Sequence, residues 1–252
     1  MFKNFKLSEA HIPAWLLIIV AVLFMIFGIF IGSEINKDKH IVQANESISL
    51  EEQTTEEPTS AVRTVDKTQW NLILVNKWNS IPDNYTVNLT QLKDGHSVDE
   101  RIYPDLQQMM DDCRADGLDP VICSSYRTNE KQTKLFNRKI NQYLDKGYSQ
   151  SEAERLAGEI VAVPGTSEHQ LGLALDIVDS SYQTLDEQQE NTEVQKWLMA
   201  NSWKYGFILR YPTDKRDITG ITYEPWHYRY VGKEAAKEIY DAGICLEEYL
   251  SQ

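Results

Sequence analysis

The stretch of residues 167–176, with the sequence SEHQLGLALD, constrains the fold more than any other part of this chain. His169 and Asp176 lie there among small and apolar neighbours, seven positions apart. If both bind one cation, each must approach it to about 2.0–2.2 Å. A straight strand would separate them by roughly 23 Å, and a helix would separate them by about 10.5 Å in rise. The segment must therefore bend, and Gly172 is the residue that permits the bend.

The residues after this glycine have the pattern of a half-buried strand. Leu173, Leu175 and Ile177 alternate with Ala174 and Asp176, which places the two groups on opposite faces. Asp176 then shares a face with Ala174, whose small side chain leaves room above the sheet. The pattern predicts a pocket with an acidic floor.

Charge and cysteine content restrict the class of protein. The 252 residues carry a formal net charge of -13, which argues against nucleic acid as a partner because nucleic acid is bound by clustered Lys and Arg. The three cysteines, Cys113, Cys123 and Cys245, leave two possibilities open: one disulfide with a free thiol, or three thiols. No C-x-x-C pair is present, so a cysteine-rich zinc site is not expected.

The N-terminal part divides into three segments. Residues 12–31 carry no charge and are almost wholly apolar, a length that spans a bilayer core. We expect a short cytoplasmic tail (1–11) and a retained single-pass transmembrane anchor (12–32), with the rest of the chain outside the cell. A cleaved signal peptide is the alternative, but its apolar run would be shorter and would end in a small-x-small site.

Residues 33–68 are rich in Glu, Ser, Thr and Gln and poor in apolar side chains. This composition predicts an acidic flexible tether that holds a folded domain off the membrane.

The folded domain is expected to cover residues 69–252 and to be α+β. Runs of apolar residues, capping residues and turn signals predict both strands and helices, in an irregular order along the chain. Strands are expected at 70–75, 120–123, around Asp176, at 207–211 and at 221–231, and helices at 101–114, 128–146, from Ser149 to Pro164, at 192–203 and from Lys233. Because strands and helices do not alternate regularly, we predict a central, mostly antiparallel sheet with flanking helices.

A second chemical cluster lies at residues 223–230, YEPWHYRY. Glu224 and His227 are an odd number of positions apart, so a regular strand would point them to opposite faces. Pro225 belongs at a strand edge or bulge, and a bulge here would bring both side chains to one side.

These two clusters together predict a metal site. His169, Asp176 and His227 are the candidate ligands, and two imidazoles with one carboxylate leave an open fourth position on tetrahedral zinc, as in catalytic sites. Glu224 is then the candidate acid/base. Arg127, after a strand and at the start of a helix, is the candidate cation for a developing oxyanion. Arg210 and Lys215 are expected to be solvated loop charges, with the binding of a substrate carboxylate as the alternative.

Three longer strings carry a family resemblance: SSYRTNEKQ (124–132), PGTSEHQLGLALDI (164–177) and YEPWHYRYVG (223–232). They resemble the motifs of VanY-type D,D-carboxypeptidases, whose relatives include VanX dipeptidases and bacterial L,D-carboxypeptidases. The resemblance covers about residues 69–252 and implies the zinc peptidase fold that hedgehog domains share. It also implies one Zn²⁺ bound by His169, Asp176 and His227, a metal-dependent rather than serine-type mechanism, and the roles given above for Glu224 and Arg127.

The same resemblance places Gln132 and Ser167 in the substrate pocket, and Trp226 is expected to shape its wall. Together with the predicted anchor, the resemblance implies a membrane-anchored enzyme that removes the terminal D-alanine from peptidoglycan stem pentapeptides and contributes to glycopeptide resistance. No obligate protein partner is expected. The alternatives are an L,D-carboxypeptidase that trims tetrapeptides and a non-catalytic wall-binding domain on the same scaffold. A dipeptidase for free D-Ala-D-Ala fits an external anchor poorly, because that dipeptide is made in the cytoplasm.

Overall fold

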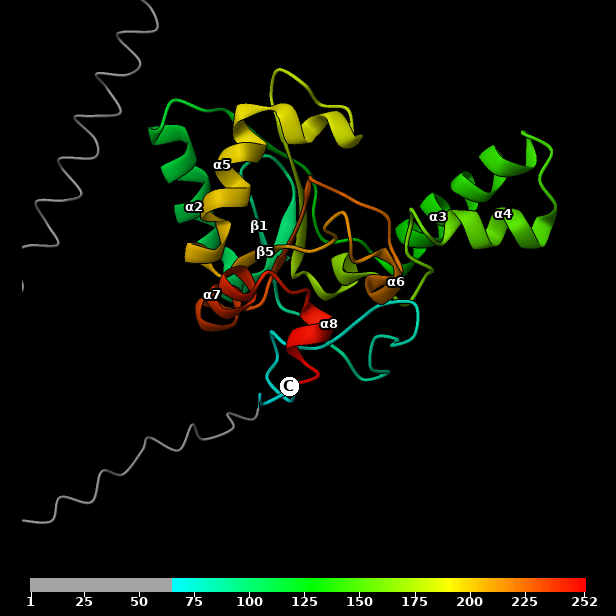
Figure 1. The fold of residues 1–252 in the computed structure, drawn as a ribbon, viewed down its shortest axis with the longest axis horizontal. Coiled ribbons are helices and arrows are strands. Elements are labelled where there is room, and N and C mark those ends of the chain that lie inside the picture. Colours follow the sequence, from blue (N-terminus) through cyan, green and yellow to red (C-terminus); the bar gives the residue numbers. More distant parts are fainter. Residues whose placement is uncertain (1–64) are drawn as a thin grey trace, which may run out of the picture. The chain divides into compact units, whose positions relative to one another are not determined.

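The computed structural model describes residues 65–252 (Figure 1). The predicted anchor and nearly all of the predicted tether therefore lie outside the described residues. Within 65–252, no helix is both long and apolar enough to cross a membrane. Val65 already packs against the apolar cluster that includes Leu246 and Val231, so folded structure begins slightly ahead of residue 69.

A four-stranded antiparallel sheet organises the described chain, with the strand order β3-β4-β6-β5. A separate two-stranded ribbon pairs β1 with β2. The strands are β1 (Leu89–Gln91), β2 (Ser97–Asp99), β3 (Pro120–Ser124), β4 (Ala174–Asp179), β5 (Phe207–Leu209) and β6 (His227–Tyr230). This arrangement confirms the predicted α+β class with an antiparallel sheet.

The helices surround this sheet. The α-helices are α2 (Tyr103–Ala115), α3 (Asn129–Leu144), α4 (Gln150–Ala157), α5 (Glu193–Asn201), α6 (Arg216–Thr219), α7 (Lys233–Ala242) and α8 (Leu246–Tyr249). Short 3-10 helices are η1 (Glu100–Ile102), η2 (Glu168–Leu171), η3 (Glu187–Asn191) and η4 (Ser202–Tyr205). Helices α3 and α4 lie side by side and project from one side of the domain (Figure 1).

Capping residues explain where several helices begin. The side chain of Thr128 accepts a hydrogen bond from the backbone N–H of Lys131 and starts α3. Ser149 and Thr192 cap α4 and α5 in the same way. These starts confirm the predicted ones, whereas α4 ends at Ala157, well before the predicted stop at Pro164.

Strand β4 is central and buried on both faces, not half-buried as its alternating pattern suggested. Leu173, Leu175 and Ile177 enter the main apolar core beneath the sheet. Ala174 and Asp176 face the opposite side and are covered as well. Loops and helices on that side enclose the functional site, so its polar residues are buried too.

The predicted strand at residues 70–75 is absent. Trp70 stacks on Tyr230 with ring centroids 5.9 Å apart, while the backbone carbonyls of Asn71 and Ile73 each accept a hydrogen bond from Arg229 Nη2 at 3.0 Å. Because the buried guanidinium of Arg229 donates to these two carbonyls, they do not pair with a neighbouring strand. All three cysteines are free thiols, with no disulfide.

Candidate metal centre and active site

A left-handed glycine turns the chain between the first two candidate ligands, as the sequence required. Gly172 ends η2 with φ +73°, and a Cβ there would lie 3.0 Å from the backbone nitrogen of Asp99. Both the backbone angle and the close approach therefore favour glycine. The turn brings His169, in η2, beside Asp176, in β4.

The ring of His169 is held by a backbone acceptor. Its Nδ1 lies 2.8 Å from the carbonyl oxygen of Ser125. Because a carbonyl can only accept, Nδ1 carries the hydrogen, and the lone pair of the ring lies on Nε2. Nε2 is 3.4 Å from Asp176 Oδ1, so the ligand-competent nitrogen faces the carboxylate.

The third ligand comes from the neighbouring strand. Asp176 and His227 are direct partners in the β4–β6 register, so their side chains share one face of the sheet. His227 Nδ1 lies 3.1 Å from Asp176 Oδ1. A backbone hydrogen bond from His227 to the Glu224 carbonyl closes a turn just before β6. This turn, rather than the predicted bulge, brings Glu224 to the side of His227.

The geometry of these three ligands fits one small divalent cation. One ligand atom from each of His169, Asp176 and His227 lies within 4.8 Å of the others. Two of the separations, 3.4 and 3.1 Å, are close to the roughly 3.3 Å edge of a tetrahedron with zinc bond lengths of about 2.0–2.1 Å. Among the described residues, Asp176 Oδ1 is the buried side-chain polar atom with no hydrogen-bond partner. A cation would satisfy it.

The pKa values of the two histidines are also consistent with a cation beside Asp176. Burial lowers the pKa of His169 to about 4, so its imidazole is neutral at physiological pH. Burial also acts to lower the pKa of His227, but the neighbouring carboxylates of Asp176 and Glu168 raise it to about 9. Without a metal, His227 therefore carries a positive charge beside Asp176, where a bound cation would take its place.

Glu224 and Arg127 flank the ligands. Burial raises the pKa of Glu224 to about 8 even though the nearby His227 opposes the shift, and one of its carboxylate oxygens lies 3.6 Å from His227 Nδ1. Arg127 donates through Nη2 to Asp176 Oδ2 at 2.7 Å and through Nε to Ser124 Oγ at 2.9 Å. Glu224 and Arg127 are therefore not an ion pair with each other.

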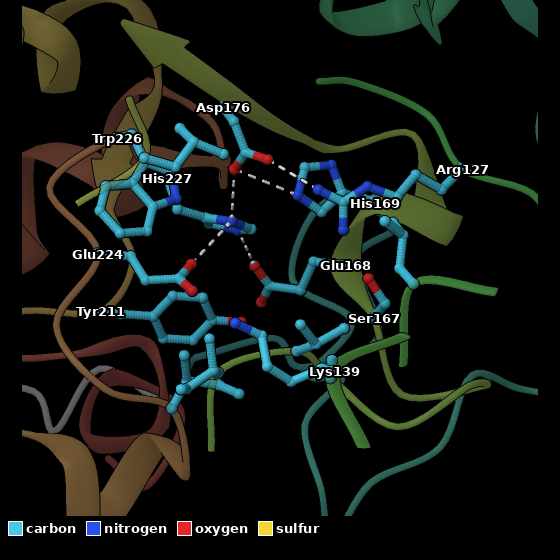
Figure 2. A pocket seen from close by; sticks show the side chains of 16 residues that line it. Arg127, Lys139, Ser167, Glu168, His169, Asp176, Tyr211, Glu224, Trp226 and His227 are labelled. Carbon is cyan, nitrogen blue, oxygen red and sulfur yellow. Dashed lines mark hydrogen bonds and ion pairs between the residues drawn. The ribbon is translucent and has the colours of Figure 1, made fainter. Parts of the chain in front are cut away.

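These groups line one pocket together with several apolar side chains (Figure 2). Ser167 and Trp226 line it, and their contact with substrate stays a prediction. Lys139, from α3, and Tyr211 also line it, although neither was predicted from the sequence. A lysine at helical spacing from other charged residues carries no sequence signal that would separate it from a solvated one.

Gln132 is placed differently from its prediction. Its side chain is fully buried and lies behind Arg127 rather than in the pocket lining. Its Oε1 accepts from Arg127 Nη1 at 3.2 Å, and its Nε2 donates to the Ala162 carbonyl at 2.7 Å. Gln132 thus holds the arginine and the loop after α4.

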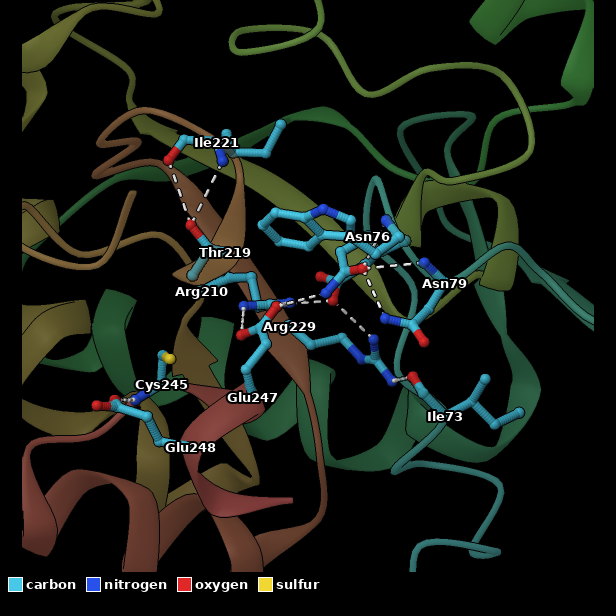
Figure 3. Close-up of polar contacts among 12 residues, drawn as sticks. Ile73, Asn76, Asn79, Arg210, Thr219, Ile221, Arg229, Cys245, Glu247 and Glu248 are labelled. Atoms are coloured by element: carbon cyan, nitrogen blue, oxygen red, sulfur yellow. Dashed lines mark hydrogen bonds and ion pairs between the residues drawn. The ribbon is translucent and has the colours of Figure 1, made fainter. Parts of the chain in front are cut away.

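Arg210 differs most from its prediction, because it is neither a solvated loop charge nor a pocket residue. It is completely buried and pairs with Glu168 through Nε and with Glu247, in α8, through both terminal nitrogens (Figure 3). Arg229 also donates to Glu168, at 2.9 Å. Lys215 pairs with Glu248.

Glu168, missed as a functional candidate, links this charged network to the metal ligands. Burial acts to raise its pKa, but the two guanidiniums of Arg210 and Arg229 hold it well below the usual range. Its second oxygen lies 3.4 Å from His227 Nε2. The one sequence feature that pointed to a functional role for Glu168 was its position next to His169.

Comparison with known proteins gives a consistent result. The family described as "VanY: D-alanyl-D-alanine carboxypeptidase" matches residues 95–233. A D-alanyl-D-alanine carboxypeptidase of Enterococcus faecalis (strain ATCC 700802 / V583) is 52% identical over 187 residues, which is 74% of this chain and 68% of that protein.

Two solved structures extend the comparison. A variant of the vancomycin resistance D,D-pentapeptidase VanY, in complex with Zn(II), has 52% identity and a TM-score of 0.67 over 72% of this chain and 99% of that chain. The LdcB LD-carboxypeptidase has 36% identity and a TM-score of 0.63 over 76% of this chain and 93% of that chain.

The matched family region contains all three ligands as well as Glu224 and Arg127. Together with the buried ligand set, the match confirms the predicted enzyme class and its metal. The chain belongs to the VanY D-alanyl-D-alanine carboxypeptidase family and is a zinc carboxypeptidase with His169, Asp176 and His227 as its metal site.

Proposed function

We propose that this chain removes the C-terminal D-alanine from peptidoglycan stem pentapeptides outside the cell membrane. The observation that carries the proposal is the convergence of three ligand atoms beside one raised-pKa carboxyl group and one arginine in a single pocket. The relatives named for D-alanyl-D-alanine and D,D-pentapeptide cleavage support this substrate class.

Zinc, when bound, would polarise the scissile carbonyl and make water a better nucleophile near neutral pH. Glu224 then takes the proton of the attacking water and transfers it to the amine of the leaving D-alanine. Its position beside His227, in the same pocket as the three ligands, suits this role.

Arg127 stabilises the negative charge that develops on the former carbonyl oxygen. A guanidinium has five N–H groups, and the contacts with Asp176, Ser124 and Gln132 occupy one on each nitrogen. Two N–H groups therefore remain for the substrate. Because the three occupied groups fix the plane of the guanidinium, little reorganisation is needed as charge builds.

The pocket walls bind the peptide on either side of the scissile bond. Ser167 offers a hydroxyl group, and Trp226 gives an apolar wall near Glu224 (Figure 2). The rest of the lining includes Leu135, Ile160, Leu185 and Ile221, side chains suited to the methyl groups of alanine residues.

The N-terminal sequence and the relatives support a proposed cell location and biological role. The apolar segment 12–31 would anchor the chain, with the zinc domain on the outer side where stem peptides are found. Removal of the terminal D-alanine there would deplete the glycopeptide target and so contribute to resistance. Cell fractionation tests the anchor: the full chain should sediment with membranes, and a chain without residues 12–32 should not.

Trimming of L,D-tetrapeptides is the second candidate, supported by the likeness to the LdcB LD-carboxypeptidase. Purified protein should be given a pentapeptide and a tetrapeptide in parallel, with and without a chelator. Faster, chelator-sensitive release of D-alanine from the pentapeptide supports the first function. Preference for the tetrapeptide supports the second. Zinc binding without turnover of either peptide would leave only the wall-binding alternative.

A further inference from the structure

Glu168 stands between two buried systems, and its two oxygens have different partners. Its side chain has no solvent exposure. Oε1 accepts from Arg210 Nε at 2.7 Å and from Arg229 Nη1 at 2.9 Å. Oε2 faces His227 Nε2 at 3.4 Å (Figure 2). One oxygen is thus held by two cations, while the other faces a metal ligand.

Both ring nitrogens of His227 lie near carboxylates, Nδ1 at 3.1 Å from Asp176 Oδ1 and Nε2 at 3.4 Å from Glu168 Oε2. A metal bound beside Asp176 would take the lone pair of Nδ1, so the one remaining ring hydrogen lies on Nε2. Ionised Glu168, which can only accept hydrogen bonds, then accepts that hydrogen. A histidine that ligates a metal through one nitrogen usually donates from the other to such an acceptor.

We propose that Glu168 is a positioning residue that fixes the tautomer and ring orientation of His227, and that Arg210 and Arg229 hold Glu168 in place for this purpose. His169 does not need such a residue, because the Ser125 carbonyl performs the same task. The two histidines therefore use different nitrogens, Nε2 in one and Nδ1 in the other.

The support for Glu168 reaches the C-terminal end of the domain. Arg229 lies on the same face of β6 as His227 and opposite the small Ala174, which leaves room for the guanidinium. Its remaining nitrogens donate to backbone carbonyls. Arg210 is fixed by two hydrogen bonds to Glu247 of α8 (Figure 3). Glu168 accordingly cannot rotate without breaking several buried charge-assisted bonds.

Glu168→Gln is the sharpest test, because an amide has nearly the shape of a carboxylate but only one acceptor oxygen. If that oxygen faces the two arginines, the NH₂ group faces His227 Nε2 and favours the wrong tautomer. If it faces His227, the NH₂ group meets two donors. Either way His227 loses its orientation, and we expect the zinc dissociation constant to rise about 10- to 100-fold.

Glu247→Gln is the matched control. It makes the same chemical change against the same Arg210, but it has no contact with a metal ligand. Gln keeps one acceptor oxygen for the terminal nitrogens of Arg210, and the bond from Arg210 Nε to Glu168 remains. Its zinc dissociation constant should stay within about threefold of wild type by the loss of one distant charge alone. Zinc affinity is measured by competition with a chromophoric chelator, and the visible spectrum of the Co²⁺-substituted proteins reports the ligand geometry. Equal zinc affinity in Glu168→Gln and wild type, or equal losses in both variants, would overturn the proposal.

The wild-type protein provides a second test that needs no variant. In zinc-loaded, ¹⁵N-labelled protein, imidazole NMR spectra report which nitrogen carries hydrogen. We expect Nε2–H for His227 and Nδ1–H for His169, and Nδ1–H for His227 would refute the proposal. Both tests read the metal site without substrate. A failure of the proposed peptidase function would therefore leave their outcome unaffected, and the reverse also holds.

Discussion

Two buried polar clusters meet at consecutive residues of η2, and they are satisfied in different ways. Glu168 belongs to a network in which Arg210 and Arg229 find acceptors for all of their nitrogens. His169 belongs to the cluster with Asp176 and His227, where Asp176 Oδ1 has no hydrogen-bond donor.

This difference indicates which of the two clusters is suited to bind a metal ion and take part in catalysis. Buried charges are costly unless they are paired, and the arginine network meets that condition within the protein. In the ligand cluster, Arg127 pairs with Asp176 Oδ2, but Oδ1 has no hydrogen-bond donor. Two of the ligand separations are close to the edge of a tetrahedral zinc site, so a cation would satisfy this oxygen. We therefore assign a structural role to the arginine network and a catalytic role to the ligand cluster. Glu168 contacts both.

The largest effect is expected from breaking the ligand cluster itself. Asp176→Ala removes the ligand that both histidines face, so zinc should be lost and D-alanine release should fall to the uncatalysed background. Zinc content by plasma emission spectroscopy, measured beside pentapeptide turnover, checks this. Retained zinc together with retained turnover would place the metal elsewhere.

The next largest effect tests whether Glu224 acts in proton transfer without binding the metal. Glu224→Gln should lower kcat by about 10²- to 10⁴-fold, because proton transfer is lost, while zinc content remains at one ion per chain. Steady-state kinetics on the zinc-loaded variant measures it. A variant that turns over at the wild-type rate would remove Glu224 from the mechanism.

Arg127→Lys tests whether charge alone is enough in the pocket. Lysine keeps the cation but lacks the planar fork that contacts Asp176, Ser124 and Gln132. We expect kcat to fall by about 10²-fold, as for the loss of one oxyanion donor, with little change in KM. An effect confined to KM would instead indicate a role in ground-state binding only.

The structural cluster should respond in stability rather than in turnover. Glu247→Gln leaves part of the buried Arg210 guanidinium poorly paired, and we expect the free energy of unfolding to fall by about 1–3 kcal/mol. Denaturant unfolding measures the loss, and kcat of the folded, zinc-loaded variant should stay within about threefold of wild type. A loss of turnover without a loss of stability would reverse the assignment of the two clusters.

The smallest effect is a difference in acid stability. Burial acts to raise the pKa of Glu247, but Arg210 holds it below the usual range. A carboxyl group whose folded pKa is depressed stabilises the fold above its unfolded pKa of about 4.3 and loses that contribution as pH falls through the folded pKa. Below about pH 4.3, the free energy of unfolding should therefore decrease less steeply with falling pH in Glu247→Gln than in wild type. Equal slopes in the two proteins would contradict this.

Much of the ligand cluster could be predicted, because local rules determine it. The bend at Gly172 follows from the spacing of His169 and Asp176, and the structure has it with φ +73°. The start of α3 at Thr128 follows from a capping side chain. The pairing of Asp176 with His227 needed only an antiparallel sheet in this register.

The arginine network could not be predicted, because its partners are far apart in sequence. Arg210 and Glu168 are 42 positions apart, and Arg229 contacts a backbone carbonyl 158 positions away. A charged residue without a known partner is by default a solvated one, which is why Arg210 was misread. The same contacts explain why the apolar run at 70–75 is not a strand.

Zinc-edge anomalous diffraction from crystals of the wild-type protein tests the central claim most directly. We predict one anomalous peak about 2.0–2.2 Å from His169 Nε2, Asp176 Oδ1 and His227 Nδ1, with Glu224 beside its open position. A zinc-soaked crystal with no peak at these three atoms, or with a peak bound by other residues, would contradict the account.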